Sequence, residues 1–484
     1  MLFKKLISFL HQIAGLLFVL FPIMICAQNI IIKGNAPGAE GKTITLLTYN
    51  NQITYIEEKI TSAPIDSSGN FIISFNIEDT ISAILKIDYY KSGIFIEPNN
   101  TYILKIDSID YHALNEKTNP YYEPKQLNYS ILNINNKDLN FIIPIFDGIY
   151  NDYIRENYSA IYRFRDFSKI DTFRVMINRA FSYVKSDFFK NYVNYSIALL
   201  EIPFISSSRS IIAEKYLKNR PVQYENLRYM NFFNDFFDNY LLSSYAIKKE
   251  DLIQTINYTP DYYALTDTLG KDSLLRNEVL RELVLLKGLY QLSNDKEFNK
   301  NNISTILLQL SKHTKFETHR KIAENIMQLF NKLQPSTIAP PFSLKDINKQ
   351  IVSLSDFKGK YVYLNFWTSW CTTCQSEFGM MNKLKEIYGS KIAFVSISAD
   401  KEFLTMVNYL KTQKYNWQFL HFDDNYDLLE AYGINSYPIF VLIDTQGKII
   451  SYPALKPSES IANYFEYLIK KDNPTIKKPL FPKP

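Results

Sequence analysis

The pattern of apolar and polar positions divides the chain into three parts. In the first part, residues 29–108, apolar side chains alternate with polar ones over short runs, and turn sequences such as Ser-Ser-Gly-Asn at residues 67–70 separate the runs. Strands are predicted at residues 30–32, 43–48, 53–60, 71–75, 81–87 and 101–106. Short, regularly spaced strands of this kind predict an all-β, sandwich-like domain over residues 28–110.

The second part, residues 111–333, shows the longer period of helices. Apolar residues recur three or four positions apart on one face over residues 275–292, and the same spacing continues over residues 303–333. We therefore expect an α-helical region here. Its many tyrosine and phenylalanine side chains could line a groove for peptide or glycan, or could simply form the core, and the pattern leaves both open.

The third part begins after a hinge at residues 334–341, where three prolines prevent a helix from continuing. Beyond the hinge, strands are predicted at residues 361–366, 392–399, 417–422, 439–444 and 448–452, and helices at 371–388, 401–411 and 458–471. This alternation predicts an α/β domain over residues 336–473. Residues 474–484 contain four prolines and no apolar period, so we expect a disordered tail.

The first 27 residues have the pattern of a signal peptide. Two lysines precede an apolar run at residues 13–25, and the small residue Ala27 follows. Because the run is short for a membrane span, we predict export with cleavage after Ala27. Two alternatives stay open: a retained anchor helix, and a lipid anchor on Cys26, although Ile25 is larger than the residue that usually precedes a lipid-modified cysteine.

The cysteine content indicates redox chemistry. Cleavage after Ala27 would remove Cys26 and leave only Cys371 and Cys374, which can form one intramolecular bond. Two cysteines are too few for a disulfide framework or a four-cysteine zinc site, and Gln375 in place of histidine after Cys374 excludes haem attachment. An exported protein whose only thiols form a Cys-x-x-Cys pair is most simply a redox protein.

The composition excludes other classes of function. The chain has 484 residues, of which 46% are hydrophobic, so its length exceeds what one core accommodates and folded domains are expected throughout. Its net charge is only +5, and no basic run with interleaved aromatic residues is present, so nucleic acid is not expected as a partner. No motif requires a nucleotide, flavin or metal, and we expect no cofactor.

The cysteine pair lies where a predicted strand gives way to a helix. The strand at residues 361–366 is followed by a short loop to Trp370, and Cys371 opens the helix. Unpaired N–H groups and the positive end of the helix dipole stabilise a thiolate at this position. We therefore predict that Cys371, exposed beside Trp370, is the nucleophile, and that the more buried Cys374 resolves the mixed disulfide.

Two segments resemble the thioredoxin superfamily, and more closely its TlpA/ResA branch of envelope thiol-disulfide oxidoreductases. They are Tyr-Val-Tyr-Leu-Asn-Phe-Trp-Thr-Ser-Trp-Cys-Thr-Thr-Cys-Gln-Ser-Glu at residues 361–377 and Gly-Ile-Asn-Ser-Tyr-Pro-Ile-Phe-Val-Leu-Ile-Asp at residues 433–444. The resemblance covers residues 336–473 and implies a thioredoxin fold there. Asn365 stands where thioredoxins carry a buried aspartate, as in the TlpA/ResA branch. The β-rich domain resembles those that precede thioredoxin modules in many Gram-negative envelope proteins.

The resemblance also implies roles for individual residues. Pro438 would be a cis-proline that faces the thiols, so that the backbone at Tyr437 can pair with an extended substrate strand. Tyr437 and Trp370 would contact the partner protein. Glu377, three residues after Cys374, matches the active-site glutamate of the branch and would carry the proton for Cys374.

We therefore predict an exported thiol-disulfide oxidoreductase of the periplasm or cell envelope. It would reduce disulfides in envelope proteins and be re-reduced by a membrane electron donor, and the uncharged pair Thr372-Thr373 favours a reducing potential. One alternative is a partner-binding envelope protein with a vestigial thioredoxin module. Another is a peroxiredoxin-like peroxidase, because Thr368 lies three residues before Cys371, although Leu364 occupies the position of that pattern's proline.

Overall fold

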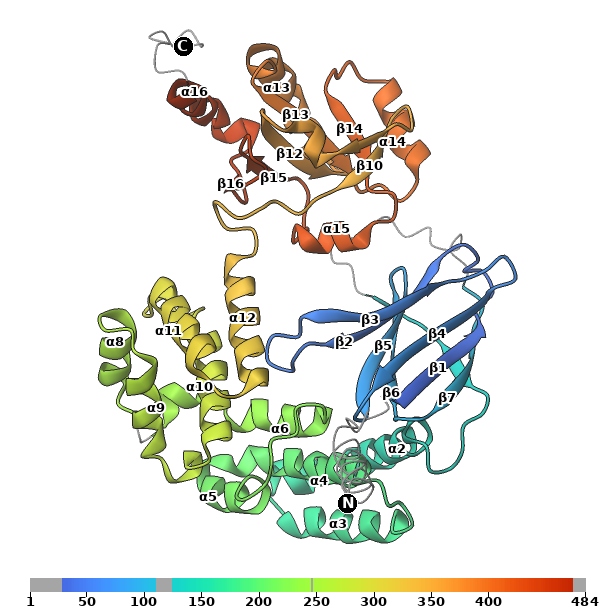
Figure 1. Ribbon diagram of the computed structural model, residues 1–484, viewed down its shortest axis with the longest axis vertical. Helices are drawn as coiled ribbons and strands as arrows, with labels where there is room; N and C mark the ends of the chain where they lie inside the picture. The colour runs from blue at the N-terminus through green and yellow to red at the C-terminus, as the bar shows by residue number, and fades with distance from the viewer. Residues whose placement is uncertain (1–27, 110–123, 245–246, 473–484) are drawn as a thin grey trace, which may run out of the picture.

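The computed structural model describes residues 28–109, 124–244 and 247–472 of the chain. These residues form a β-rich part, a helical part and a C-terminal α/β part, so the predicted multidomain fold class is confirmed (Figure 1). The expected signal peptide, residues 1–27, and the expected tail, residues 474–484, lie outside the described residues. No helix in the described part of the chain is both long and apolar enough to cross a membrane.

The β-rich part consists of two sheets that share one core. Its strands are β1 Gln28–Asn35, β2 Thr43–Tyr49, β3 Glu57–Pro64, β4 Asn70–Ile77, β5 Ile81–Ile87, β6 Tyr90–Ile96, β7 Thr101–Ile106, β8 Lys125–Gln126 and β9 Tyr129–Ile131. One sheet has the order β4-β1-β7-β9 and the other β3-β2-β5-β6-β8. In β5, for example, Ala83, Leu85 and Ile87 are buried while the residues between them are less so, which is the alternation that predicts a strand.

Some strands of the β-rich part are not predicted by the sequence pattern. β6 escapes prediction because Lys-Ser-Gly at residues 91–93 interrupts its apolar alternation. β8 and β9 are too short to show a period, and residues 125–131 fall in the range that we expected to be helical. β8 pairs with β6 and β9 pairs with β7, so these residues extend both sheets of the sandwich.

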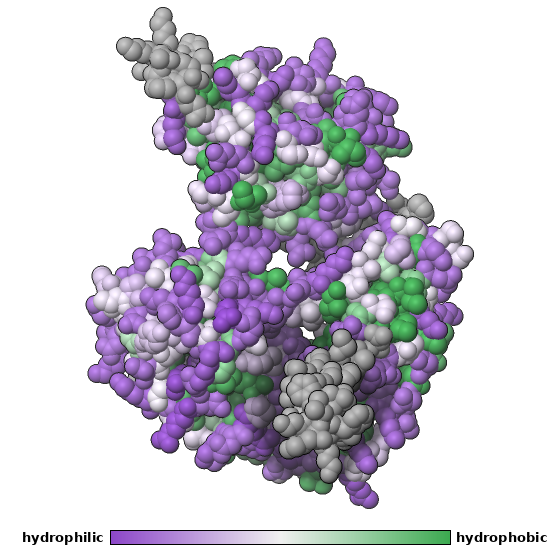
Figure 2. All heavy atoms as spheres, viewed as in Figure 1, coloured by the Kyte–Doolittle hydropathy of each residue, from purple (hydrophilic) through white to green (hydrophobic). Residues whose placement is uncertain are grey.

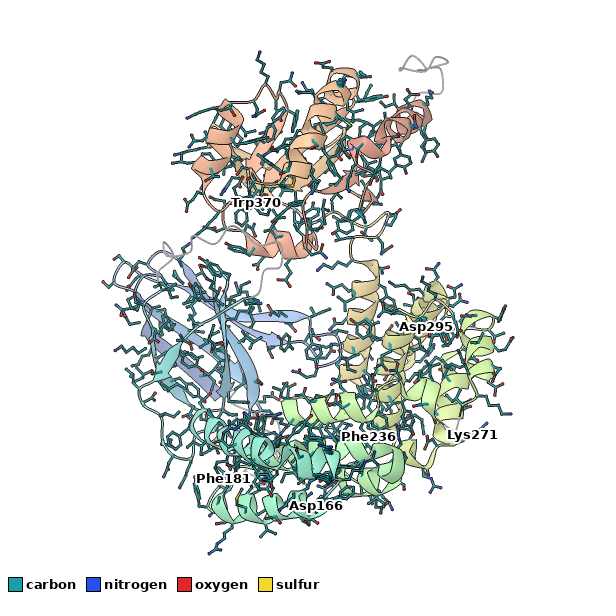
Figure 3. The ribbon with its side chains drawn as sticks, turned by 180° about the vertical axis from the view of Figure 1, so that it is seen from behind. Asp166, Phe181, Phe236, Lys271, Asp295 and Trp370 are labelled. Carbon is teal, nitrogen blue, oxygen red and sulfur yellow. A yellow bond between two sulfur atoms is a disulfide. The ribbon has the colours of Figure 1, made fainter. Side chains whose placement is uncertain are left out.

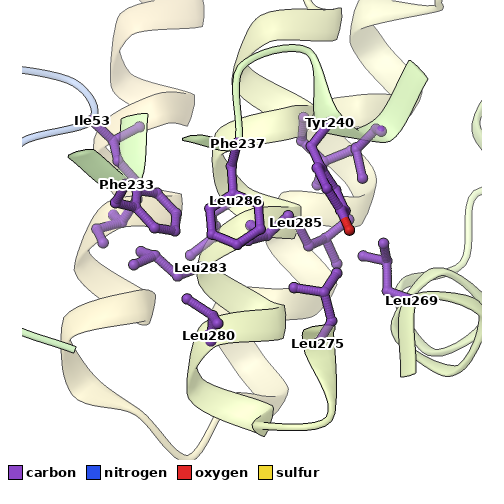
Figure 4. Close-up of a cluster of buried hydrophobic side chains, with 14 of the residues drawn as sticks. Ile53, Phe233, Phe237, Tyr240, Leu269, Leu275, Leu280, Leu283, Leu285 and Leu286 are labelled. Atoms are coloured by element: carbon purple, nitrogen blue, oxygen red, sulfur yellow. The ribbon is translucent and has the colours of Figure 1, made fainter. Parts of the chain in front are cut away.

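The helical part begins, within the described residues, at Leu139. Its helices are α2 Leu139–Tyr158, α3 Phe167–Ala180, α4 Asp187–Glu201, α5 Ile205–Tyr216, α6 Leu227–Phe236, α7 Tyr240–Ser243, α8 Lys249–Asn257, α9 Tyr262–Gly270, α10 Glu278–Leu292, α11 Lys300–His313 and α12 Glu317–Asn331, with the short helices η1 Ser159–Arg163, η2 Ile202–Phe204 and η3 Ser273–Leu275. Leucines spaced three residues apart on α10, at 280, 283 and 286, are buried in the core as their period predicts (Figure 4).

The turn between β2 and β3 reaches into this helical core. The Asn51 side chain accepts hydrogen bonds from the N–H groups of Ile53 (3.0 Å) and Thr54 (2.9 Å), which turns the chain. For this reason β3 begins only at Glu57, and the strand expected at residues 53–60 is misplaced. Ile53 packs among the buried side chains of the helical part (Figure 4), so the β-rich and helical parts share apolar contacts.

The α/β part is a seven-stranded sheet covered by helices. Its strands are β10 Ser343–Asp346, β11 Ile351–Ser353, β12 Tyr361–Trp367, β13 Ile392–Ser398, β14 Gln418–His421, β15 Ile439–Ile443 and β16 Ile449–Ser451, and its helices are α13 Thr372–Tyr388, α14 Phe403–Lys411, α15 Tyr426–Ala431, α16 Ile461–Asp472, η4 Leu354–Phe357 and η5 Pro457–Glu459. The strand order is β11-β10-β14-β13-β12-β15-β16. β12, β13 and β14 are parallel, whereas β15 runs antiparallel to β12.

The central strand β12 is buried on both faces. Tyr361, Tyr363 and Trp367 pack in one hydrophobic cluster with α13 and α16. The apolar residues between them pack in the other cluster, which includes α15, and Asn365 is buried as well. A strand that lies under helices on both sides is apolar at almost every position, and this explains why its pattern is strong in the sequence.

The α/β part meets the β-rich part through few side chains. Lys86 of β5 and Asp427 of α15 form an ion pair at 2.5 Å, and the ring centroids of Tyr89 and Tyr426 lie 5.2 Å apart. Figure 2 shows openings in the surface between the α/β part and the rest of the molecule. Besides this contact, the hinge after α12 connects the α/β part to the helical part (Figure 1).

Candidate active site

A disulfide joins Cys371 and Cys374 where β12 ends and α13 begins. Cys371 is the N-cap residue of α13, and its sulfur accepts a hydrogen bond from the backbone N–H of Cys374 (3.1 Å). The Thr373 hydroxyl lies 3.3 Å from the same sulfur. The first turn of a helix leaves N–H groups without partners, so the local fold directs donors at any charge that this sulfur carries.

Cys371 is less accessible than we expected from the sequence. The residue is 6% exposed and Cys374 is fully buried, because both pack in the hydrophobic cluster of β12, α13 and α16. The expectation of an exposed Cys371 is therefore wrong, whereas the greater burial of Cys374 is as expected. Trp370 is 40% exposed and lies on the side of the α/β part that is turned toward the β-rich part (Figure 3).

Pro438 lies next to the cysteine loop because two strands pair. The peptide bond between Tyr437 and Pro438 is cis. The next residue, Ile439, pairs with Phe366 near the end of β12, from which the cysteine loop continues. The Tyr437 ring meets the Trp370 ring edge-on, with the centroids 6.0 Å apart. The structure thus places Tyr437 and Pro438 beside the loop that carries Trp370 and the disulfide.

Glu377 is held by a residue that the sequence analysis does not identify. Glu377 is 8% exposed, and its carboxylate accepts hydrogen bonds from the Ser458 hydroxyl (2.6 Å) and the Ser458 backbone N–H (3.0 Å). Ser458 belongs to η5, which packs on α13 although it lies 81 residues further along the chain. Glu377 is therefore on the helix that carries Cys374, but within the described structure its hydrogen bonds are to Ser458.

A second residue missed by the sequence analysis, Asp400, holds the loop before Cys371. Asp400 follows β13 and is 2% exposed. Its carboxylate accepts hydrogen bonds from the Ser369 N–H (3.0 Å to each oxygen), the Ser369 hydroxyl (2.9 Å) and the Ser398 hydroxyl (2.8 Å). Gln375 donates to the Ser369 carbonyl (2.8 Å) from the other side. An acidic residue directly after a central parallel strand is a signal that could have identified Asp400.

His421 supports Asp400 from the neighbouring strand. Its Nδ1 accepts the backbone N–H of Asp423 (3.1 Å), so the proton is on Nε2, which donates to the Asp400 carbonyl (2.6 Å). Burial lowers the pKa of His421 below its ordinary value, although the Asp400 carbonyl and neighbouring carboxylates oppose this shift. The ring is consequently neutral at neutral pH.

Asn365 belongs to a short buried chain of hydrogen bonds under the site. Its side-chain oxygen accepts from the Ser396 hydroxyl (2.5 Å), which in turn accepts from Trp417 Nε1 (2.8 Å). Asn365 and Ser396 are both fully buried on the adjacent strands β12 and β13. An amide cannot exchange a proton at neutral pH, so this chain ties the strands together without titrating.

These groups can support thiol-disulfide exchange. Two sulfurs three residues apart at a helix N-terminus can alternate between a dithiol and a disulfide without unwinding the helix. Within the described part of the chain, no three histidine, cysteine or carboxylate side chains are grouped so that they could hold a metal ion.

Comparisons with known proteins find relatives for part of the chain. Residues 335–452 match the family model described as the AhpC/TSA family. Thiol-disulfide oxidoreductase ResA of Bacillus subtilis (strain 168) is 32% identical over 133 residues, which are 27% of this chain and 74% of that relative. The thioredoxin-like protein YneN of the same organism is 36% identical over 140 residues, 26% of this chain and 76% of the relative. The solved thioredoxin domain of a thiol-disulfide oxidoreductase from Bacteroides vulgatus is 27% identical and covers 28% of this chain and 97% of its own, with a TM-score of 0.26.

These two relatives align with about a quarter of the chain and with about three quarters of their own length, and the family model matches residues within the α/β part. This part contains the disulfide, the cis-proline and the sheet order described above. By its α/β part, the chain belongs to the ResA-like thiol-disulfide oxidoreductases with a thioredoxin-like fold.

Proposed function

We propose that the protein is an exported enzyme that reduces disulfides in proteins of the cell envelope, with Cys371 as the nucleophile and Cys374 as the resolving thiol. The observation that carries this proposal is the N-cap position of Cys371, whose sulfur accepts the Cys374 N–H at 3.1 Å. A thiolate at this position gains a hydrogen bond and the favourable end of the helix dipole. Cys374, fully buried, is the sulfur that a bulky partner reaches less easily.

The reaction would proceed in two exchanges. The Cys371 thiolate attacks one sulfur of the substrate disulfide and forms a mixed disulfide, while the other substrate sulfur leaves as a thiolate that takes up a proton. Cys374 then gives up its proton and attacks the Cys371 sulfur, which restores the enzyme disulfide and releases the second substrate thiol. Two electrons pass from the enzyme to the substrate, and a membrane electron donor would restore the dithiol.

Substrate contacts in this proposal come from the cis-proline side of the site. An extended segment of the partner would pair with the backbone at Tyr437 and pack against the exposed ring of Trp370, which meets the Tyr437 ring edge-on. Glu377 lies one turn after Cys374 on α13 and is held there by Ser458, and it would carry the proton that Cys374 loses. Pro438 would keep the Tyr437 backbone facing the sulfurs.

Export and direction are supported by the sequence. The signal-peptide pattern of residues 1–27 supports transfer to the periplasm or cell envelope, where disulfides form. The pair Thr372-Thr373 between the cysteines carries no positive charge that would stabilise the thiolate further, and this favours the reducing direction.

The mixed disulfide offers the direct test of these roles. A Cys374→Ser variant should trap partner proteins on Cys371 as complexes that dithiothreitol releases, because the resolving step is lost. A Cys371→Ser variant, the matched control, should trap few or none. Equal trapping by both variants would contradict the assigned roles, and full biological activity of the double serine variant would favour a binding protein with a vestigial redox module.

A further inference from the structure

Asp400 places a buried carboxylate under the turn that carries Cys371. Among the residues that the structure describes, the groups that donate hydrogen bonds to its oxygens are the N–H and hydroxyl of Ser369 and the hydroxyl of Ser398, and each is neutral. His421 is neutral as well, and it donates to the backbone carbonyl of Asp400 and not to the carboxylate. The negative charge of Asp400 is therefore solvated by dipoles but is not compensated by any of these partners.

Asp400 lies near both the loop that carries Cys371 and the segment that carries Tyr437. Ser369 is two residues before Cys371, so their Cα atoms are at most ~7.6 Å apart. In the segment before Pro438, burial raises the pKa of Tyr437, and the nearby charge of Asp400 raises it further. Other ionisable groups near Asp400 and the loop include Lys401 and Glu402, which follow Asp400 in the chain, Asp423 and Asp424 near His421, and Glu377 on α13.

A charge at this range affects the sulfur chemistry. A negative charge within roughly 10 Å of a thiolate, at the effective dielectric constant of a protein, changes an equilibrium that creates the thiolate by about tenfold. The disulfide carries no charge, so the negative charge of Asp400 does not destabilise it. Asp400 therefore opposes formation of the thiolate and favours the disulfide relative to the dithiol, which makes the dithiol a stronger reductant.

We propose that Asp400 is a positioning residue of the redox site, which fixes the Ser369–Cys371 turn through its carboxylate and, by a negative charge that its hydrogen-bond donors do not neutralise, keeps the cysteine pair reducing. This inference rests on the proposed function, since it presumes that Cys371 reacts as a thiolate. It assigns to one buried side chain both the geometry of the loop and part of the redox poise of the protein.

The test compares Asp400→Asn with the wild type. Both proteins are the whole chain without residues 1–27, so that Cys371 and Cys374 are their only cysteines. Asparagine has the shape of aspartate and can still accept from Ser369, but it carries no charge. The rate of alkylation of the reduced protein by iodoacetamide is measured against pH, with the modified cysteine identified by mass spectrometry. For Asp400→Asn the pH of half-maximal rate should fall by about one unit, a tenfold change.

The redox equilibrium provides the second readout of the same variant. In glutathione buffers at pH 8, Asp400→Asn should shift the equilibrium toward the dithiol by several-fold, up to the same tenfold, which corresponds to ~30 mV. Asp444→Asn is the matched control: Asp444 also accepts two backbone N–H groups, from Gln446 and Lys448 (2.8 Å each), but it follows the other end of β15. It should leave both readouts unchanged.

If Asp400→Asn does not fold, Ser369→Ala decides the question. It removes the hydroxyl that donates to the carboxylate and leaves the charge less well solvated. It should therefore raise the pH of half-maximal alkylation by about 0.3 to 0.5 units, a two- to threefold change in the equilibrium. A shift in this direction supports the proposal. Unchanged alkylation and redox equilibria in Ser369→Ala, or in a folded Asp400→Asn that is merely less stable, would overturn it.

The wild type separates this inference from the proposed function. If the wild-type pair shows no reversible couple with glutathione, the proposed function fails before the variants are compared. If the wild type cycles normally and Asp400→Asn behaves in the same way, only the role of Asp400 fails.

Discussion

Asp400 in the α/β part and Glu282 in the helical part are both buried carboxylates within dense hydrogen-bond networks. Glu282 on α10 accepts from the Tyr262 hydroxyl (2.7 Å) and from the Thr314 hydroxyl, and it lies 2.7 Å from His319 Nδ1. The other ring nitrogen of His319 lies 2.7 Å from the Tyr224 hydroxyl. Both networks thus satisfy a buried anion almost completely.

The two networks differ in what surrounds them. Although burial opposes the shift, hydrogen bonds from His319, Thr314 and Tyr262 hold the pKa of Glu282 below its ordinary value. The partners of Glu282 come from α9, α12 and the loop between α11 and α12, so the network connects helices. Asp400 instead holds the loop that ends at the disulfide sulfur of Cys371. Burial and hydrogen bonding are therefore common to the two carboxylates, and the proposed redox pair beside Asp400 is what distinguishes them.

The largest expected effect concerns the reactive group itself. Cys371→Ser should lower the rate of disulfide reduction at least about 10³-fold, because no other sulfur can start the exchange. Reduction of insulin disulfides with dithiothreitol as the electron source measures this loss. The helical part should unfold as in the wild type. A variant that retained a tenth of the activity would break the comparison, since the loop held by Asp400 would then not matter for chemistry.

The next largest effect is on stability in the helical part. Glu282→Ala leaves the His319 ring and two hydroxyls without their buried partner and should lower the free energy of unfolding of this part by about 3 kcal/mol. Circular dichroism in denaturant reports it, whereas tryptophan fluorescence should not change, since Trp367, Trp370 and Trp417 all lie in the α/β part.

Glu278→Ala is the matched control for Glu282→Ala. Glu278 lies one turn earlier on α10 and pairs with Lys315 at the surface, where its side chain is 51% exposed. Its removal should cost less than about 1 kcal/mol. If the two variants were equally stable, or if Glu282→Ala altered alkylation of Cys371, the distinction between the two networks would be lost.

A smaller effect is expected from the pH dependence of His421. Since burial lowers its pKa below about 6.5, the unfolded chain binds the proton more readily than the folded one, and stability is lost as pH falls from about 6.5 toward the folded pKa. The slope is at most about 1.4 kcal/mol per pH unit. Denaturation followed by tryptophan fluorescence at pH 7 and pH 5 should show this loss, and His421→Gln should reduce it. If the free energy of unfolding fell by the same amount between pH 7 and pH 5 in the wild type and in His421→Gln, the loss could not be due to His421.

The smallest effect should come from an exposed carboxylate. Asp427, whose side chain is 76% exposed, pairs with Lys86 across the contact between the α/β and β-rich parts. Asp427→Asn should change the free energy of unfolding by less than about 1 kcal/mol, and salt should remove the difference. Unfolding at low and high salt measures it. A loss comparable to that of Glu282→Ala would show that this contact locks the parts together.

Local signals in the sequence account for what could be predicted. The strand at residues 361–366, the helix that starts at the cysteines and the proline at 438 are all encoded in short motifs, and the structure places them as those motifs imply. The β-sandwich and the long leucine-rich helix follow from their apolar periods.

Contacts between distant residues account for what could not be predicted. Ser458 meets Glu377 across 81 residues and Asp400 meets Ser369 across 31, and no local pattern announces either contact. The burial of Cys371 likewise depends on the hydrophobic cluster that β12, α13 and α16 form together, and the misplaced strand at 53–60 depends on a turn that the helical core accommodates. Tertiary packing decided each of these features.

The reduction potential of the Cys371–Cys374 pair tests the central claim most directly. It can be measured in glutathione or dithiothreitol buffers with tryptophan fluorescence as the reporter, because all three tryptophans belong to the α/β part. We predict a reversible couple near that of thioredoxin, roughly −270 mV, as expected of a reductant. A value near roughly −120 mV would identify a disulfide donor and contradict the proposed direction, and the absence of a couple would contradict the enzyme itself.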